Sequence, residues 1–152
     1  MYVRAAEPQD VETLVAFNAA MAEETEDLVL DERVLRGGVR RIVEDPAAGL
    51  CIVCETDEAG VVGTLSITRE WSDWRCGWFW WIQSVYVVPE VRGRGVFTEL
   101  YDHARDLARE SEEVIGLRLY VEHGNVRAQR VYARLGMRET AYRIYEETFG
   151  GA

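Results

Sequence analysis

The chain has 152 residues, of which 48% are apolar and 29% are charged, a composition typical of one soluble domain that buries its own core. Its 17 basic and 27 acidic residues give a formal charge of −10, whereas nucleic-acid-binding proteins are normally basic, so no nucleic-acid partner is expected. No apolar run reaches the ~20 residues of a membrane span, and the first residues do not resemble a signal peptide. We therefore expect a cytoplasmic protein with no membrane partner.

The first half of the chain predicts two helices between strands. Pro8 begins a helix with apolar residues at helical spacing, and Asp31 caps a second one. Gly37 and Gly38 lower the propensity of the second helix and predict a break there. The expected elements are a strand at residues 2–5, helices starting at residues 8 and 31, and strands at residues 50–56 and 61–69.

The second half predicts alternating strands and helices. Pro89 ends a long strand, and Gly136 occupies the left-handed C-cap position of the last helix. The order β-α-α-β-β-β-α-β-α-β predicts a single α/β domain over residues 1–152, with a mixed sheet and helices on both of its faces. The expected elements are strands at residues 78–88, 115–121 and 138–148 and helices at residues 95–110 and 125–135.

Three cysteines are expected to be free thiols. Cys51 and Cys54 have a spacing found in metal and redox sites, but they lie on an expected strand, where residues three apart point to opposite faces. No second cysteine–histidine pair completes a zinc site. We therefore expect no bound metal.

A glycine-containing turn at residues 91–97, Val-Arg-Gly-Arg-Gly-Val-Phe, joins the long strand to the next helix. Glycines let the backbone approach a ligand closely, and phosphates bind at helix N-termini, where backbone N–H groups are unpaired. Arg92 and Arg94 add positive charge to an acidic chain. The turn lacks the sequence of a Walker A loop and of a dinucleotide site. Its two glycines alone could also serve chain geometry only.

Two segments together resemble the GNAT family of N-acetyltransferases. Arg92 and Gly95 match a signature of the form Arg/Gln-x-x-Gly-x-Gly/Ala, with Phe97 in place of its last residue. Residues 119–137 resemble the family's other cofactor segment, a strand followed by Asn125, an alanine, a tyrosine and a glycine. The resemblance implies a mixed, mostly antiparallel sheet with the acyl-CoA N-acyltransferase fold. It also implies transfer of an acetyl group from acetyl-CoA to an amine.

The resemblance further implies which residues hold acetyl-CoA. Main-chain groups of the long strand would bond the pantetheine arm, and amides of the turn would hold the pyrophosphate. Asn125 is a favoured N-cap residue and is expected to cap its helix in any case. We expect the ring of Phe97 to pack in the core. The implied cofactor-binding residues are Val85, Tyr86, Val87, Arg92, Gly93, Arg94, Gly95, Val96, Phe97, Thr98, Asn125, Ala128 and Tyr132.

For catalysis, the resemblance implies Tyr132 as the general acid that protonates the leaving thiolate. An ammonium group with a pKa near ~10 must lose a proton before it attacks, and family members often place a glutamate on the long strand for this purpose. This chain has Gln83 there, which can orient water or substrate but cannot act as a base. Other candidates for the base are Glu122, Glu23 and Glu24, each of which could equally be a solvated surface carboxylate.

Five tryptophans lie between residues 71 and 81. Strand alternation puts Trp78 and Trp80 on one face and Trp81 and Gln83 on the other. Some of these rings are expected in the core, and others could contact an aliphatic ammonium through cation–π interactions. We expect a small cationic amine as the acceptor, contacted by Glu23, Glu24, Trp81 and Gln83.

Three functions stay open from the sequence. The leading one is an N-acetyltransferase that acts on a small amine or on a protein or peptide amine. The second is a non-catalytic acetyl-CoA-binding module, because the long strand has no glutamate at the usual position. The third is a protein-interaction module that uses the tryptophan-rich face. Homodimers are common in the family, so a homodimer is compatible with all three.

Overall fold

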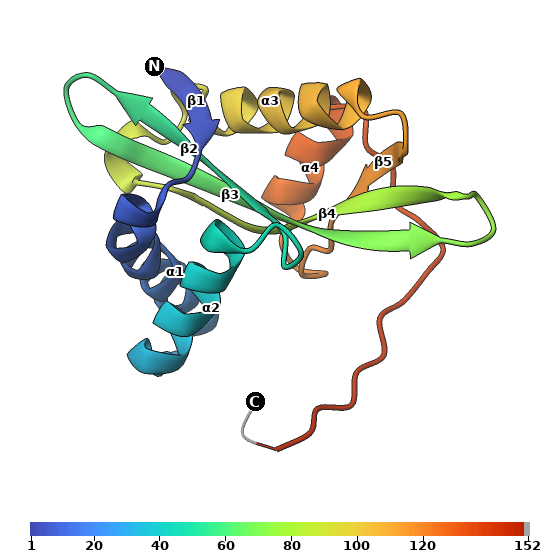
Figure 1. Ribbon diagram of the computed structural model, residues 1–152, viewed down its shortest axis with the longest axis horizontal. Coiled ribbons are helices and arrows are strands. Elements are labelled where there is room, and N and C mark those ends of the chain that lie inside the picture. The colour runs from blue at the N-terminus through green and yellow to red at the C-terminus, as the bar shows by residue number, and fades with distance from the viewer. Residues whose placement is uncertain (151–152) are drawn as a thin grey trace. The chain divides into compact units, whose positions relative to one another are not determined.

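Five strands form one sheet in the order β1-β2-β3-β4-β5, so each strand lies beside its neighbours in the sequence (Figure 1). The first three neighbouring pairs are antiparallel and β4 and β5 are parallel, which confirms the predicted mixed, mostly antiparallel sheet. The strands are β1 (Tyr2–Ala5), β2 (Leu50–Thr56), β3 (Gly60–Ser72), β4 (Gly77–Val87) and β5 (Val114–Arg118).

The computed structural model describes residues 1–150 and divides into two units, Met1–Leu119 and the chain from Tyr120 onward. The sheet and three of the helices belong to the first unit. The expectation of one domain over residues 1–152 stays a prediction.

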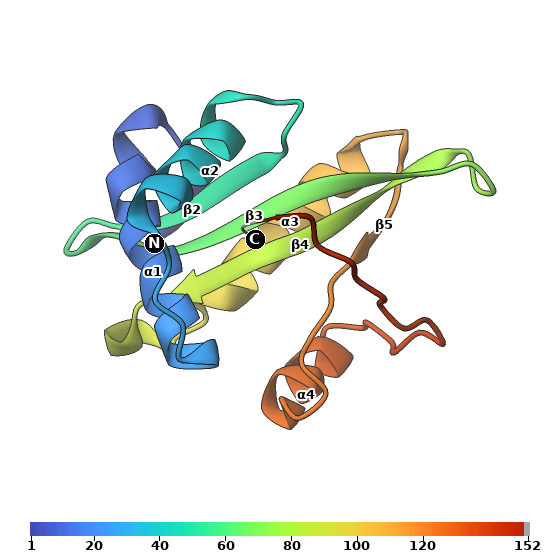
Figure 2. The same ribbon diagram turned by 90° about the horizontal axis from the view of Figure 1, so that it is seen from below.

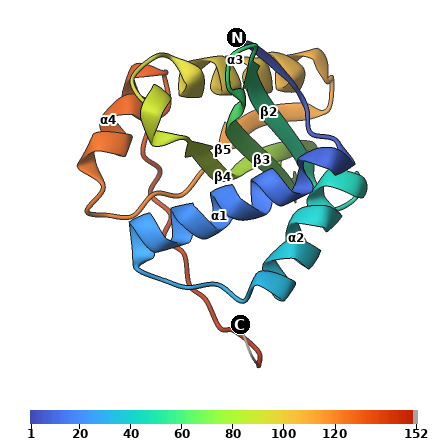
Figure 3. The same ribbon diagram turned by 90° about the vertical axis from the view of Figure 1, so that its left-hand side faces the viewer.

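Helices cover both faces of the sheet in the first unit (Figures 1 and 3). The helices α1 (Val11–Glu26) and α2 (Glu32–Glu44) lie on one face, and α3 (Val96–Glu110) lies on the other. Short 3-10 helices, η1 (Pro8–Asp10) and η2 (Pro89–Val91), precede α1 and the turn before α3. The side chain of Asp31 caps α2, as predicted, by accepting hydrogen bonds from the backbone N–H groups of Arg33 and Val34.

The predicted break in α2 is wrong, because the helix continues through Gly37 and Gly38. A glycine costs a helix roughly 1 kcal/mol relative to alanine. Val39, on the apolar side of α2, is buried in the cluster that joins both helices to the sheet. Packing of that side therefore outweighs the weak propensity of the two glycines.

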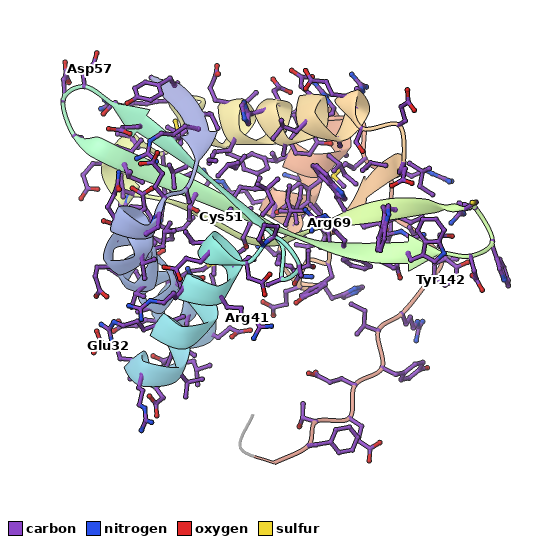
Figure 4. The ribbon with its side chains drawn as sticks, viewed as in Figure 1. Glu32, Arg41, Cys51, Asp57, Arg69 and Tyr142 are labelled. Atoms are coloured by element: carbon purple, nitrogen blue, oxygen red, sulfur yellow. The ribbon has the colours of Figure 1, made fainter. Side chains whose placement is uncertain are left out.

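Residues of β2 alternate between the two faces. Cys51 and Val53 pack with Val11 and Leu14 of α1, and Figure 4 shows Cys51 beside the helices. Ile52 and Cys54, at the intervening positions, face away from these helices and are also buried. Cys51 and Cys54 are free thiols on opposite faces, and no group of residues that could hold a metal is found in the described part of the chain.

The two longest strands, β3 and β4, form a hairpin that runs past the rest of the sheet at one end (Figure 2). Aromatic side chains gather there: Trp71 and Trp78 meet edge to face at 5.1 Å between ring centroids, and Trp74 at the tip is 92% exposed.

No described helix is long and apolar enough to cross a membrane.

The second unit contains α4 (Val126–Arg134), which lies within the predicted helix. Asn125 caps it, with its side-chain oxygen accepting a hydrogen bond from the backbone N–H of Ala128 at 3.1 Å. Gly136 has a φ of +94°, as its predicted left-handed C-cap position requires.

The last strand, predicted for residues 138–148, is wrong: no strand follows α4 in the described residues. A strand needs a neighbour that accepts and donates ladder hydrogen bonds. None of the sheet's four ladders includes this segment. Its large apolar side chains Tyr142, Ile144 and Tyr145 are exposed, as is Phe149 directly after it.

Candidate active site

The turn between β4 and α3 has the backbone shape that an anion site needs. Gly93 and Gly95 adopt φ angles of +78° and +86°, which residues with side chains rarely adopt, and no atom lies within 4 Å of where a Cβ would stand. The first hydrogen bond within α3 runs from the N–H of Glu99 to the carbonyl of Gly95 at 3.0 Å. Residues 96–98 precede this bond and form the first turn of the helix, where N–H groups point outward along the helix axis, and glycine at the N-cap supplies no capping side chain.

These features fit a phosphate group. The helix N-terminus carries a partial positive charge, and the open space beside the two glycines leaves room for a ligand close to the backbone. Phe97 lies beside Tyr101, with 6.0 Å between ring centroids. Its side chain is partly buried, in keeping with the expected packing role.

The side chain of Arg92 points to protein groups rather than into this open space. Its Nε donates to the carbonyl of Val87 at 2.8 Å, and its Nη2 donates to Glu24 Oε2 at 2.8 Å. The guanidinium also lies over the ring of Tyr86, 5.5 Å from the centroid. In contrast, Arg94 is exposed and has no ion pair among the salt bridges of the described residues.

The strand β4 offers main-chain groups along one edge. The N–H of Val88 donates to the carbonyl of Val62 on the β3 side at 3.0 Å. Because alternate residues of a strand direct their main-chain groups to opposite edges, Val85 and Val87 direct theirs away from β3. The ladder between β4 and β5 ends at the pair Trp81 and Arg118, so it does not cover this part of β4.

A cavity of about 220 Å³ lies on the face of the sheet that α1 and α2 cover, between these helices and the strands. Gln83 lies in its wall, and its Nε2 donates to Thr68 Oγ1 at 2.8 Å. A β-bulge between Ser84 and Ile82 leaves Gln83 as the extra residue, so Gln83 and Ser84 both line the cavity. The lining residues are Leu14, Asn18, Leu35, Gly38, Val39, Ile42, Cys51, Thr64, Ser66, Gln83 and Ser84.

None of these lining residues carries a charge. The polar ones are amides, hydroxyls and one thiol, and burial raises the pKa of the Cys51 thiol, so this group stays neutral near pH 7. Thr64 donates to the carbonyl of Ile52 at 3.0 Å, and Asn18 donates to the carbonyl of Leu14 at 2.8 Å. The cavity can therefore accept a small molecule with an uncharged body and a few hydrogen-bonding groups.

Of the residues predicted to contact the acceptor, only Gln83 lines this cavity. Glu24 pairs with Arg92, and Glu23 is exposed on α1. The indole N–H of Trp81 donates to Glu70 at 3.3 Å on the neighbouring strand. The cavity residues on β3, Thr64 and Ser66, were not predicted from the sequence, although polar residues at alternate positions of an otherwise apolar strand were a visible signal.

The remaining predicted residues lie in the second unit. Tyr132 is on α4, and burial raises the pKa of its hydroxyl, so the hydroxyl stays protonated at neutral pH. Glu122 is exposed, and its backbone carbonyl accepts a hydrogen bond from Gln129 Nε2 at 3.1 Å. Ala128 donates its N–H to Asn125. Their roles in binding and catalysis stay predictions.

Comparison with known proteins identifies the protein family to which this chain belongs. The model of the acetyltransferase (GNAT) family matches residues 13–137, which include α4 and the turn between β4 and α3. A solved structure described as "a possible acetyltransferase from Clostridium difficile 630" is 40% identical, with a TM-score of 0.90 over 97% of this chain and 96% of that one. This protein belongs to the GNAT acetyltransferase family and is an acetyl-CoA-dependent N-acetyltransferase.

More distant structures share the fold alone. The ribosomal-protein-alanine N-acetyltransferase of Brucella melitensis biovar Abortus 2308 is 15% identical, with a TM-score of 0.77 over 98% of this chain and 100% of that one. A transcriptional regulator from Bacillus halodurans C-125 is 22% identical, with a TM-score of 0.76 over 97% of this chain and 98% of that one. No protein of curated function matches the sequence. Because proteins with different functions share this fold, the acceptor of this protein has to be inferred from the residues of its site.

Proposed function

We propose that this protein acetylates a small primary amine whose carbon body is uncharged and occupies the cavity between α1, α2 and β4. The neutral lining of the cavity carries this proposal. A second ammonium group inside it would lack a carboxylate partner among the lining residues, and removing a charge from water without a partner is unfavourable. The size of about 220 Å³ lies below the usual range for drug-sized ligands. The sequence predicted a small cationic amine as the acceptor, and we now propose an amine with a single amino group.

Acetyl-CoA would supply the acetyl group as a thioester. In this proposal the amides of residues 96–98 hold its pyrophosphate, as their position before the first bond of α3 allows. Main-chain groups of Val85 and Val87 hold the pantetheine arm along the uncovered edge of β4. The Val85 amide polarises the thioester carbonyl. Arg94 adds a positive charge near the phosphates.

The amine nitrogen would form the new amide bond as the bond between the acetyl carbon and sulfur breaks. Tyr132, protonated at neutral pH, would give its proton to the departing thiolate and regain one from solvent, which also takes the proton that the nitrogen loses as the amide forms. Gln83 would orient the amine or a water molecule that takes the ammonium proton, since its amide is held by Thr68. Glu122, which lies beside the second family motif, stays a candidate for the general base.

An acceptor screen tests the proposal. The panel holds neutral-bodied monoamines, polyamines, aminoglycosides, amino acids and a peptide with a free N-terminus, and the readout is thiol release from acetyl-CoA. We expect turnover with monoamines and at least tenfold lower kcat/KM with polyamines. Preference for polyamines or for the peptide would contradict the assignment of the neutral cavity as the acceptor site.

Substitution of Tyr132 tests its proposed role as the general acid. Tyr132→Phe removes the hydroxyl and is expected to lower kcat by about 100-fold or more, the usual contribution of a general acid. The dissociation constant for acetyl-CoA should stay within about twofold. An unchanged kcat would show that the proton comes from another group.

A further inference from the structure

Three side chains from separate elements meet beside the phosphate-binding turn. Glu24 lies in the last turn of α1, Tyr86 lies on β4, and Arg92 follows η2. Arg92 and Glu24 are joined by a 2.8 Å ion pair across 68 positions of sequence, and the hydroxyl of Tyr86 donates to the other carboxylate oxygen of Glu24 at 3.3 Å. These residues are called the Glu24–Arg92 cluster below.

The cluster is anchored on both sides. The ring of Tyr86 is buried and packs against Phe17 of α1, with 5.1 Å between ring centroids. Burial, followed by the nearby Glu24 carboxylate, raises the pKa of the Tyr86 hydroxyl, which therefore remains a donor at neutral pH. Arg92 is fixed at its other end by the bond from its Nε to the carbonyl of Val87.

Its position connects the two halves of the proposed active site. Arg92 directly precedes Gly93 and Gly95, whose backbone shapes the turn. On α1, the same helix that carries Glu24 contributes Leu14 and Asn18 to the wall of the cavity. A change in the cluster therefore reaches both the turn that would hold the cofactor and the helix that would contact the acceptor.

The contacts of Arg92 with Glu24 and Val87 disfavour a direct bond between its side chain and phosphate. Two donors of its guanidinium are already used by Glu24 and Val87, and the carboxylate of Glu24 offsets its charge. An anion drawn to Arg92 would have to compete with that carboxylate, whereas Arg94 has no such partner among the salt bridges of the described residues.

We infer that Arg92 is a positioning residue that, through Glu24 and Tyr86, ties the phosphate-binding turn to α1 and so couples cofactor binding to the acceptor cavity. This inference rests on the proposed function. It replaces the predicted direct role of the Arg92 side chain in cofactor binding, and it replaces the predicted contact of Glu24 with the acceptor.

The test compares Glu24→Gln, Arg92→Gln and the double variant, with CoA affinity measured by calorimetry. If Arg92 positions the turn, each single variant weakens CoA binding by about two- to fivefold, the range for a half-exposed ion pair. The double variant should then be no weaker than the weaker single variant. The Michaelis constant for the amine should rise in Glu24→Gln as well.

Glu12→Gln is the matched control, because Glu12 makes a 2.8 Å ion pair from the other end of α1 to Arg36 of α2, away from the turn. We expect it to change the melting temperature about as much as Glu24→Gln and to leave CoA affinity unchanged. Unchanged or tighter CoA binding in Glu24→Gln would overturn the inference, because a freed Arg92 would then be acting on phosphate directly. Additive losses in the double variant would also overturn it. Failure of the wild-type protein to bind CoA would instead contradict the proposed function itself.

Discussion

The two faces of the sheet are built from the same strands and differ in what they bury. On the α3 face, Leu65 and Ile67 of β3 pack without exposed surface, and a Cβ at Gly63 would come within 2.8 Å of Val96 on α3. On the α1 and α2 face, the intervening residues of β3 are Thr64 and Ser66, and they line a cavity. One set of alternate residues of β3 therefore packs against α3, and the other set lines the cavity.

The bulge at Gln83 strengthens this difference. In a regular strand only one of Gln83 and Ser84 would face the cavity, whereas the extra residue lets both line it. The bulge thus adds a polar group to the cavity wall, while the neighbouring Ile82 stays buried.

The largest difference between the faces should appear in stability. Leu100 of α3 is fully buried against the sheet, so Leu100→Ala is expected to lower the free energy of unfolding by about 2–5 kcal/mol. Ser66→Ala on the opposite face should cost about 1 kcal/mol or less. Urea denaturation of both variants measures the two values, and equal losses would show that the cavity face is packed as tightly as the α3 face.

A smaller effect comes from Asp10, a buried polar residue whose role is structural. Arg4 donates two hydrogen bonds to its carboxylate, and this contact lowers the pKa of Asp10. Because the folded pKa is depressed, the stabilisation is present above the unfolded value of about 3.9 and is lost as the pH falls through the folded value.

Asp10→Asn should therefore lower the free energy of unfolding by about 1–3 kcal/mol at pH 7, as expected for a hydrogen bond to a charged group. The gap between wild type and variant should narrow below about pH 4. Urea denaturation at several pH values measures it, and kcat/KM of the folded variant should not change. A gap that is constant with pH would exclude the carboxylate charge as its source.

The sequence predicted most elements of the first unit because local patterns determine them: an N-cap at Asp31, a stop at Pro89 and alternation in the strands. The prediction from sequence failed where contacts with distant parts of the chain determine the structure. The segment 138–148 was predicted as a strand but has no ladder in the described residues. The glycines of α2 indicated a break that the burial of Val39 overrides.

The site shows the same limit. Glycine permits the positive φ angles of Gly93 and Gly95, so the sequence could predict the turn. The ion pair of Arg92 with Glu24 was not, since it joins residues 68 positions apart and depends on how α1 lies on β4. Gln83 was placed at the acceptor by family resemblance, whereas the bulge that turns it into the cavity could only be seen in the fold.

The cavity on the α1 and α2 face is the proposed acceptor site, and two neighbouring glycines of α2 test this central claim most directly. Apart from the chain neighbours and the backbone of α2 itself, no atom lies within 4 Å of where a Cβ would stand at Gly37 or Gly38. Both lie inside the helix, but only Gly38 lines the cavity. Leucine is a better helix former than glycine at either position. Gly38→Leu fills the cavity, and Gly37→Leu serves as the matched control.

The measurement is the Michaelis constant for the best amine found in the acceptor screen, together with that for acetyl-CoA. We predict that Gly38→Leu raises the constant for the amine by about tenfold or more, about 1.4 kcal/mol in binding, and leaves that for acetyl-CoA unchanged. Gly37→Leu should change neither. Equal Michaelis constants for the amine in the two variants would contradict the assignment of this cavity as the acceptor site.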